Sequence, residues 1–217
     1  MSHITLIRHG QANSSAQDEA SYDQLSDLGH QQAVWLGAHM HDTQQNHTRL
    51  YVGSLKRHAQ TAQAMKTGLE PPIDPRLNEL EYFTLAAALR DEHGIPLTED
   101  QHGFTSHLPR VFAAWEKGEI EGAPETFVHF ESRIADALDD IKARQGPALV
   151  VTSGGLISCV MRQHLRLDIT GMAQLALAIM NTSMHRLYPI GGNWSPVLFN
   201  AVPHLEYPDR HHAQTHV

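Results

Sequence analysis

The sequence predicts an α/β fold, a three-layer sandwich with a mostly parallel central sheet and a helical lid inserted into it. Short apolar runs at residues 4–7, 50–52 and 148–151 have the length and β-rich composition of buried strands. Segments with helical periodicity follow them along the chain, and strands that alternate with helices form sheets covered on both faces. The 217 residues fit a single domain, 1–217, with an insertion at about 82–125.

The first half of the chain supplies two strand and helix units. After the first strand, a polar loop at residues 11–24 leads to a helix for which Ser26 is the expected N-cap. The second strand, residues 50–52, feeds a helix that runs from about residue 55 to Gly68 and ends before a proline pair.

Residues 82–125 differ in character from the sequence on either side. Two helical stretches, at about 85–93 and 108–117, are separated by glycine, proline and polar residues, so we expect an insertion or lid. After it, apolar side chains recur every three or four residues from Phe127 to Ile141, which predicts a long amphipathic helix that a Gly-Pro pair ends.

The last third of the chain completes the sheet. Residues 148–151 have the composition of a central parallel strand, and Ser153-Gly154-Gly155 opens the helix that follows. Two further strands are predicted at 184–188 and 196–199, on either side of a glycine turn.

Composition narrows the class of protein. The single cysteine, Cys159, cannot form an internal disulfide, and its apolar helical surroundings predict a buried, inert thiol in a reducing compartment. No apolar stretch approaches the roughly 20 residues that span a bilayer, and we expect a cytoplasmic protein with no membrane partner. The net charge of -8 and the scattered Lys and Arg disfavour nucleic acid as a partner.

The chain contains 17 histidines, which raises the question of a metal site. The four near the C-terminus, His204, His211, His212 and His216, lack the spacing of metal ligands and have no cysteine partners. We therefore expect a polar C-terminal tail and no bound metal or other cofactor.

Charged and glycine-rich residues follow two of the predicted strands. Arg8, His9 and Gly10 come directly after the first strand, and Ser153-Gly154-Gly155 comes shortly after the strand at 148–151. Ligands of such sheets bind beyond the carboxyl ends of the strands, so these segments can meet there. Arg57, in the first turn after the second strand, can join them, and guanidinium groups bind phosphate oxygens in a fixed geometry.

Taken together, these segments resemble the histidine phosphatase superfamily, the phosphoglycerate-mutase-like proteins. The resemblance covers nearly the whole chain, and the matching segments follow in order at residues 6–10, 25–33, 54–62, 77–79, 124–133, 150–155, 181–183 and 200–205.

The resemblance implies a phosphatase that works through a phosphohistidine intermediate. In it His9 would be the nucleophile, Arg8 and Arg57 would hold the phosphoryl group, and Glu79 would be the proton donor. Physical chemistry agrees with these roles, because nearby guanidinium charges keep an imidazole neutral and able to attack. Phosphoryl transfer needs mainly positioning and positive charge, which arginines supply without a metal.

Two departures from the family pattern qualify this prediction. The superfamily usually has a second histidine where this chain has Ser153, so Ser153 is expected either to contact the phosphate or only to form the turn. If the lost charge-assisted bond is felt wholly in the transition state, the rate is lowered roughly five- to thirtyfold. The segment after Glu79 also differs, and Glu81 would point to the same side of an extended chain, so both remain candidates for the acid.

Two more polar residues lie close in sequence to the candidate site residues. Asn13, in the loop after His9, is a phosphate-binding candidate that could equally cap a turn. His58 is adjacent to Arg57, and because neighbouring helical residues diverge by about 100°, we expect it to face away from the site.

Three functions are compatible with these residues. A phosphatase acting on a phosphorylated small molecule or phosphoprotein comes first, and a phosphate-binding pseudoenzyme, favoured by Ser153, is the alternative. A phosphoglycerate mutase ranks lower, because Arg90, Arg110 and Lys117 of the predicted lid lie among many acidic residues. Substrate identity and oligomeric state stay open, with a homodimer among the options.

Overall fold

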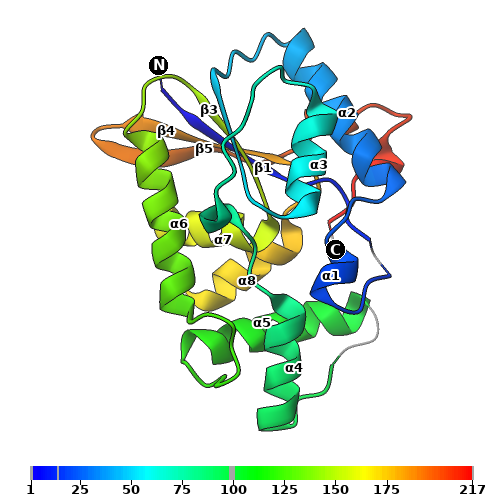
Figure 1. The fold of residues 1–217 in the computed structure, drawn as a ribbon, viewed down its shortest axis with the longest axis vertical. Helices are drawn as coiled ribbons and strands as arrows, with labels where there is room; N and C mark the ends of the chain where they lie inside the picture. The colour runs from blue at the N-terminus through cyan, green and yellow to red at the C-terminus, as the bar shows by residue number, and fades with distance from the viewer. Residues whose placement is uncertain (1, 14, 98–100, 217) are drawn as a thin grey trace.

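A five-stranded sheet forms the centre of the molecule, a computed structural model that describes residues 2–13, 15–97 and 101–216 (Figure 1). Its strands lie in the order β2-β3-β1-β4-β5. The first three are parallel, and the last two are antiparallel to their neighbours. The strands are β1 (Ile4–Arg8), β2 (Arg49–Val52), β3 (Ala148–Thr152), β4 (Met184–Ile190) and β5 (Asn193–Ala201).

The register of the central strands aligns their carboxyl ends. Arg8 at the end of β1 pairs with Thr152 at the end of β3, although 144 positions separate them in the sequence (152 − 8). The next residue of each strand, His9 and Ser153, is therefore brought to the same edge of the sheet.

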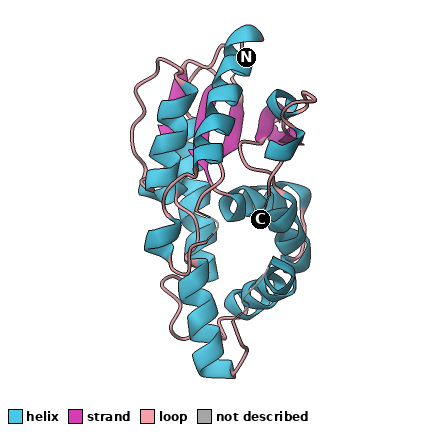
Figure 2. Ribbon diagram, turned by 90° about the vertical axis from the view of Figure 1, so that its right-hand side faces the viewer, coloured by secondary structure: helices cyan, strands magenta, loops and turns pink. Residues whose placement is uncertain are grey.

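Helices cover both faces of this sheet (Figure 2). On one face, Ile7 and Val151 pack with α2 (Asp27–Asp42) and α3 (Lys56–Met65). On the other, Leu6 and Val150 pack with α6 (Phe127–Lys142) and α7 (Gly154–Leu165). Adjacent strand residues point to opposite faces, so these fully apolar strands are buried on both sides and make the predicted three-layer arrangement.

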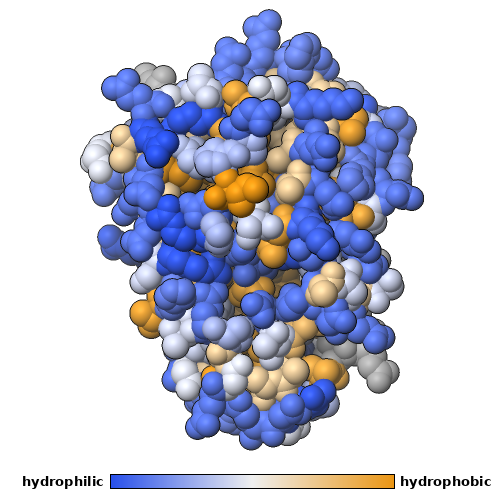
Figure 3. Space-filling model, viewed as in Figure 1, coloured by the Kyte–Doolittle hydropathy of each residue, from blue (hydrophilic) through white to orange (hydrophobic). Residues whose placement is uncertain are grey.

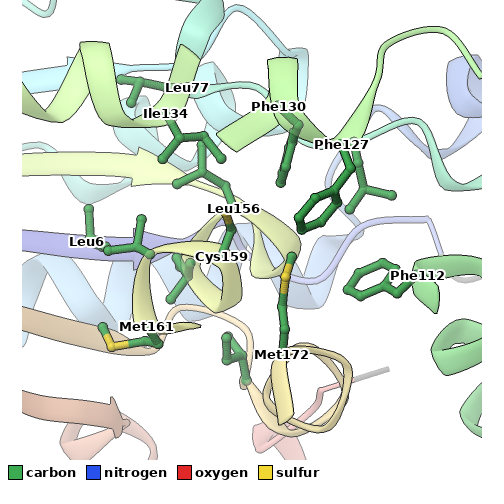
Figure 4. Packing of buried hydrophobic residues seen from close by; sticks show 14 of the residues in the cluster. Leu6, Leu77, Phe112, Phe127, Phe130, Ile134, Leu156, Cys159, Met161 and Met172 are labelled. Carbon is green, nitrogen blue, oxygen red and sulfur yellow. The ribbon is translucent and has the colours of Figure 1, made fainter. Parts of the chain in front are cut away.

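The segment predicted as an insertion shares the core of the second face. It contains α4 (Tyr82–His93) and α5 (Gln101–Glu116), and α5 packs on α8 (Ile169–Ala178). Phe112 of α5 lies near Phe127 and Met172 in one continuous apolar cluster (Figure 4). The helices of this segment are confirmed, while their role as a lid stays a prediction.

Most predicted helices are confirmed, and Ser26 does cap α2, since its hydroxyl accepts from the Gly29 amide. Two elements differ from the prediction. The loop predicted at residues 11–24 contains a short helix, α1 (Glu19–Tyr22), which Asp18 caps. Helix α5 begins at Gln101, earlier than the predicted residue 108, and contains Pro109.

The C-terminal segment is packed against the body of the protein, which the prediction of a polar tail did not anticipate. His204 and Ala213 are fully buried. The Asn181 amide donates to the Thr215 carbonyl at 2.8 Å, and the Gln32 side chain donates to the Ala213 carbonyl at 2.7 Å. Within residues 2–13, 15–97 and 101–216, no group of three or more His, Cys, Asp or Glu side chains is arranged to hold a metal ion.

The outer surface in the view of Figure 3 is mainly hydrophilic, with apolar patches between the polar side chains. None of the described helices is both long and apolar enough to cross a membrane. Cys159 is buried as predicted, and burial raises the pKa of its thiol to about 12.

Candidate active site

His9 lies just beyond the end of β1 and is held there by its backbone and its ring. Its amide donates to the Thr152 carbonyl at 2.9 Å, so β3 fixes its position. Its Nδ1 lies 2.7 Å from the Gly10 carbonyl oxygen. A carbonyl can only accept, so Nδ1 carries the proton and Nε2 of the neutral ring keeps its lone pair. This is the tautomer that a nucleophilic Nε2 requires.

Several causes hold the pKa of His9 well below its usual range. Burial is the largest, because the side chain is 98% removed from solvent (2% exposed) and its charged form loses hydration. The positive charges of Arg57 and Arg8 and the ring of His58 act in the same direction. The imidazole is therefore neutral at physiological pH.

Arg57 is held by Tyr22, the last residue of α1 (Glu19–Tyr22), and by Asp23, which follows it. Its Nη1 donates to the Asp23 carboxylate at 3.1 Å, and its guanidinium lies 5.0 Å from the centre of the Tyr22 ring. Asp23 also accepts from the backbone amides of Lys56 and Arg57, so it caps α3 in place of Leu55. Arg57 is 2% exposed, and its Nε has no partner among the described residues.

Arg8 points toward the N-terminus of α7. A Cβ built on Gly154 would lie 3.5 Å from its Nε, and this Nε also has no partner among the described residues. Its Nη1 donates to the backbone carbonyls of Ile179 and His216. Part of the guanidinium is thus free to bind an oxyanion, and part is occupied by the C-terminal segment.

Glu79 lies at the N-terminus of α7. Its carboxylate accepts from the Gly155 amide at 2.8 Å and from its neighbour Leu80 at 3.1 Å. A Cβ on Gly155 would come within 2.4 Å of the carboxylate, so glycine is needed for this contact. Glu81 instead accepts from the Thr84 hydroxyl at 3.2 Å, near the start of α4. The two glutamates therefore differ in place, and only Glu79 bonds to α7.

Ser153 is fully buried at the N-cap of α7, and its hydroxyl does not cap the helix. Its Oγ lies 2.6 Å from Nε2 of His58, whose ring centre is 5.7 Å from that of His9. The prediction that His58 faces away was wrong. Arg57 and His58 do diverge, but at this end of α3 both directions point into the protein, one toward Tyr22 and one toward Ser153.

Asn13 was predicted as a phosphate-binding or turn-forming residue. Its side-chain amide donates to the Ser21 carbonyl at 3.0 Å, and its carbonyl oxygen accepts from the Ser15 hydroxyl at 2.8 Å. Both ends of the side chain thus bond within its own loop, which favours the turn-forming role.

A cavity of about 460 Å³ opens beside these residues. Arg57 and Glu79 lie in its wall, whereas His9 lies outside it. Its charged lining comprises Glu19, Asp23, Arg57, Glu79, Glu81, Glu125 and Arg133. Burial raises the pKa of Glu19, and the carboxylates of Glu81 and Glu79 add to the shift. The cavity has more carboxylates than guanidinium groups, in contrast to the arginine-flanked His9.

The fold and this arrangement match a known family. A family model described as the histidine phosphatase superfamily (branch 1) matches residues 4–202. The chain therefore belongs to the histidine phosphatase superfamily. No curated protein sequence matches the chain significantly.

Solved structures with a similar fold include three with phosphatase in their names. A variant of phosphoserine phosphatase from Entamoeba histolytica, in complex with phosphoserine, has a TM-score of 0.69 at 18% identity, covering 94% of this chain and 100% of its own. A mycobacterial glucosyl-3-phosphoglycerate phosphatase has 0.65 at 24%, covering 93% and 99%. A putative α-ribazole-5'-P phosphatase from Escherichia coli has 0.64 at 17%, covering 93% and 98%. At these identities the likeness shows the fold.

Sequence reasoning missed three residues of this site: Tyr22, Asp23 and His58. Tyr22 and Asp23 lie in a loop without periodicity, and only folding brings them against Arg57. For His58 a signal existed, because it is adjacent to Arg57 in a chain that has serine at position 153 where the resemblance leads one to expect a histidine.

Proposed function

We propose that the protein is a metal-independent phosphatase that hydrolyses phosphate monoesters through a phosphohistidine formed on His9. The observation that carries this proposal is the state of that imidazole. It is neutral, its Nδ1 proton is held by the Gly10 carbonyl, and two guanidinium groups are close enough to lower its pKa. A lone pair on Nε2 beside unpaired guanidinium N–H donors suits attack on a phosphoryl group.

In this proposal each neighbouring group has a separate task. The unpartnered Nε atoms of Arg8 and Arg57 would donate to the phosphoryl oxygens, where negative charge develops. Ser153 would add a hydroxyl donor at the N-terminus of α7. Glu79 would protonate the leaving alcohol and later activate water for hydrolysis of the phosphohistidine.

The charge of the cavity supports a phosphatase over a phosphoglycerate mutase. A mutase needs basic groups for the substrate carboxylate, and the candidates were Arg90, Arg110 and Lys117. None of them lines the cavity of the described residues, and Arg90 and Lys117 pair with neighbouring acids. Among phosphate esters, the acidic cavity favours small molecules whose alcohol part carries no carboxylate.

The test is turnover with a matched variant. The purified protein is incubated with p-nitrophenyl phosphate and a panel of phosphorylated metabolites and phosphopeptides, in the presence of EDTA. We expect His9-dependent release of inorganic phosphate, a loss of at least about 10³-fold in His9→Ala, and an acid-labile phosphohistidine in quenched reactions. Equal rates for the wild type and His9→Ala would overturn the proposal.

The enclosed setting of His9 and Arg8 favours a second candidate, a phosphate-binding protein without turnover. His9 is 2% exposed and lies outside the cavity wall, and Nη1 of Arg8 is engaged by the His216 and Ile179 carbonyls. A site closed in this way could bind an anion without admitting a whole ester. Calorimetry with inorganic phosphate separates the candidates, because binding without phosphate release from any ester would support this second one.

A further inference from the structure

Ser153 is the N-cap residue of α7, but its hydroxyl does not make the usual capping hydrogen bond. A serine at an N-cap usually accepts from an amide of the first helical turn. In α7 the carboxylate of Glu79 takes the Gly155 amide instead, at 2.8 Å, and the Ser153 hydroxyl makes no capping bond. The Ser153 Oγ is thereby left for another partner, and that partner is Nε2 of His58 at 2.6 Å.

We propose that His58 is a positioning residue of the phosphoryl site, which donates from Nε2 to the Ser153 hydroxyl and so directs the hydroxyl proton toward a bound phosphoryl oxygen. This inference rests on the proposed function. It means that the imidazole absent from position 153 is supplied from position 58 on α3 and acts through the serine.

The tautomer of His58 follows from its surroundings. Its Nδ1 is buried and has no hydrogen-bond partner among the described residues, whereas Nε2 faces the Ser153 oxygen. A proton on Nδ1 would be a buried donor without an acceptor, which is costly, so the proton belongs on Nε2. Burial, and next to it the charge of Arg57, lowers the pKa of His58 well below its usual range and keeps the ring neutral.

Ser153 can accept from His58 and still donate. A hydroxyl has two lone pairs and one proton, so with Nε2–H as its donor its own proton is available for an oxyanion. Hydrogen bonds in such a chain strengthen one another in a low-dielectric interior. Both side chains are fully buried, and the His58 ring lies 5.7 Å from the His9 ring, so the hydrogen bonds from His58 through Ser153 lead into the candidate site.

The backbone of the preceding loop is fitted to this ring. Gly53 follows β2, and a Cβ built on it would lie 2.3 Å from Nδ1 of His58. Any larger residue at position 53 would push the ring out of its place, so the ring is seated directly on the backbone.

The experiment compares five proteins by steady-state kinetics on one turned-over phosphate ester: the wild type, His58→Phe, His58→Gln, Ser153→Ala and the double variant His58→Phe/Ser153→Ala. Phenylalanine fills the space of the ring but cannot donate, whereas the glutamine amide can donate near the position of Nε2. We expect His58→Phe and Ser153→Ala each to lower kcat about five- to thirtyfold, His58→Gln to recover most of that loss, and the double variant to be no slower than either.

A matched control comes from the other end of the sheet. His47 places its Nε2 3.0 Å from the Thr5 hydroxyl, and His47→Phe removes the same kind of contact far from the site, so its kcat should stay at the wild-type value. A second arm moves the imidazole back: His58→Ala/Ser153→His should be faster than His58→Ala alone. Thermal unfolding of each variant identifies those that fail to fold.

The outcomes separate the two proposals. Turnover that depends on His9 but is unchanged in folded His58→Phe, or losses that multiply in the double variant, would overturn the role of His58 and leave the proposed function standing. If the wild type shows no His9-dependent turnover, the proposed function fails. The inference is then tested by calorimetry with inorganic phosphate, where His58→Phe must weaken binding and His58→Gln must not.

Discussion

The two ends of the central sheet carry similar side chains in different settings. At the amino end of β1, the Thr5 hydroxyl contacts Nε2 of His47 at 3.0 Å and accepts from Arg186 at 3.1 Å. At the carboxyl end, the Ser153 hydroxyl contacts Nε2 of His58 at 2.6 Å, with two arginines nearby. Each end therefore has a buried hydroxyl, an imidazole and a guanidinium.

The difference between the ends lies in helix direction and in unused donors. Helices α3 and α7 begin at the carboxyl end, so the positive ends of their dipoles favour negative charge there, and carboxylates already accept from first-turn amides of both helices, Asp23 at α3 and Glu79 at α7. The Nε atoms of Arg8 and Arg57 have no partner among the described residues at that end. At the amino end, Thr5 already has two partners. A contact between an imidazole and a hydroxyl therefore does not by itself indicate an anion site. Helix N-termini and unpaired arginine donors must also lie nearby.

The largest expected effect is at the carboxyl end of the sheet, where the Glu79 carboxylate lies. Glu79→Gln should lower turnover of an alkyl phosphate by about 10²- to 10⁴-fold, because an alkoxide must be protonated as it leaves. The loss on p-nitrophenyl phosphate should be much smaller in kcat/KM, since p-nitrophenolate leaves without a proton. The measurement is kcat/KM on both esters, because kcat/KM reports phosphoryl transfer to His9 and does not include the later hydrolysis of the phosphohistidine, which Glu79 would also assist.

Glu81→Gln is the control for that prediction, because Glu81 contacts Thr84 and does not bond to α7. If Glu81→Gln takes the leaving-group-dependent loss and Glu79→Gln does not, the assignment of the acid is reversed.

The next effect compares the guanidinium groups of the two ends. Arg57→Ala should lower kcat/KM about 10- to 150-fold, the equivalent of a charge-assisted hydrogen bond of roughly 1.5–3 kcal/mol. Arg57→Lys should recover only part of this, because a lysine lacks the planar fork. Arg186→Ala removes bonds to Thr5 and Gln45 and should change kcat/KM less than about twofold while costing about 1 kcal/mol of stability. Similar losses of kcat/KM in Arg57→Ala and Arg186→Ala would mean that the two ends of the sheet do not differ in function.

The smallest effect is on stability, at the amino end. Burial, followed by the charges of His3 and Arg186, lowers the pKa of His47 from 6.5 to about 4. A lowered folded-state pKa means that the unfolded chain binds the proton more readily, so the free energy of unfolding falls as pH drops from 6.5 toward 4. Above pH 6.5 this contribution is fully present.

Chemical denaturation of the wild type and His47→Gln across that range measures the contribution. The difference between their free energies of unfolding should shrink with falling pH, in favour of the variant, by on the order of 2 kcal/mol. Parallel curves would mean that His47 is not held neutral by the fold.

Much of the architecture was predictable from local patterns. The β-rich runs that became β1, β2 and β3, and the periodicity that became α6, reflect burial on two faces or on one, which leaves a direct trace in the sequence. Helix α1 left no such trace, because four residues held by the Asp18 cap are too short to show a period. The C-terminal segment was also missed, since its buried residues are isolated among polar ones.

The candidate site, like the fold, has parts that the sequence predicted and parts that it did not. Arg8, His9 and Ser153 could be placed together from the sequence because they follow strands, and parallel strands end at one edge of a sheet. The contacts of Arg57 with Asp23 and of His58 with Ser153 join segments 34 and 95 positions apart, and no local rule gives their distance.

The order of residues along this chain determined which stretches could be strands or helices and which polar groups would follow a strand, because those choices depend on neighbours a few positions away. The tertiary structure decided the rest: that His58 points inward, which of its ring nitrogens carries the proton, and which carboxylate meets α7. Such features depend on contacts across the interior, and those exist only once both faces of the sheet are covered.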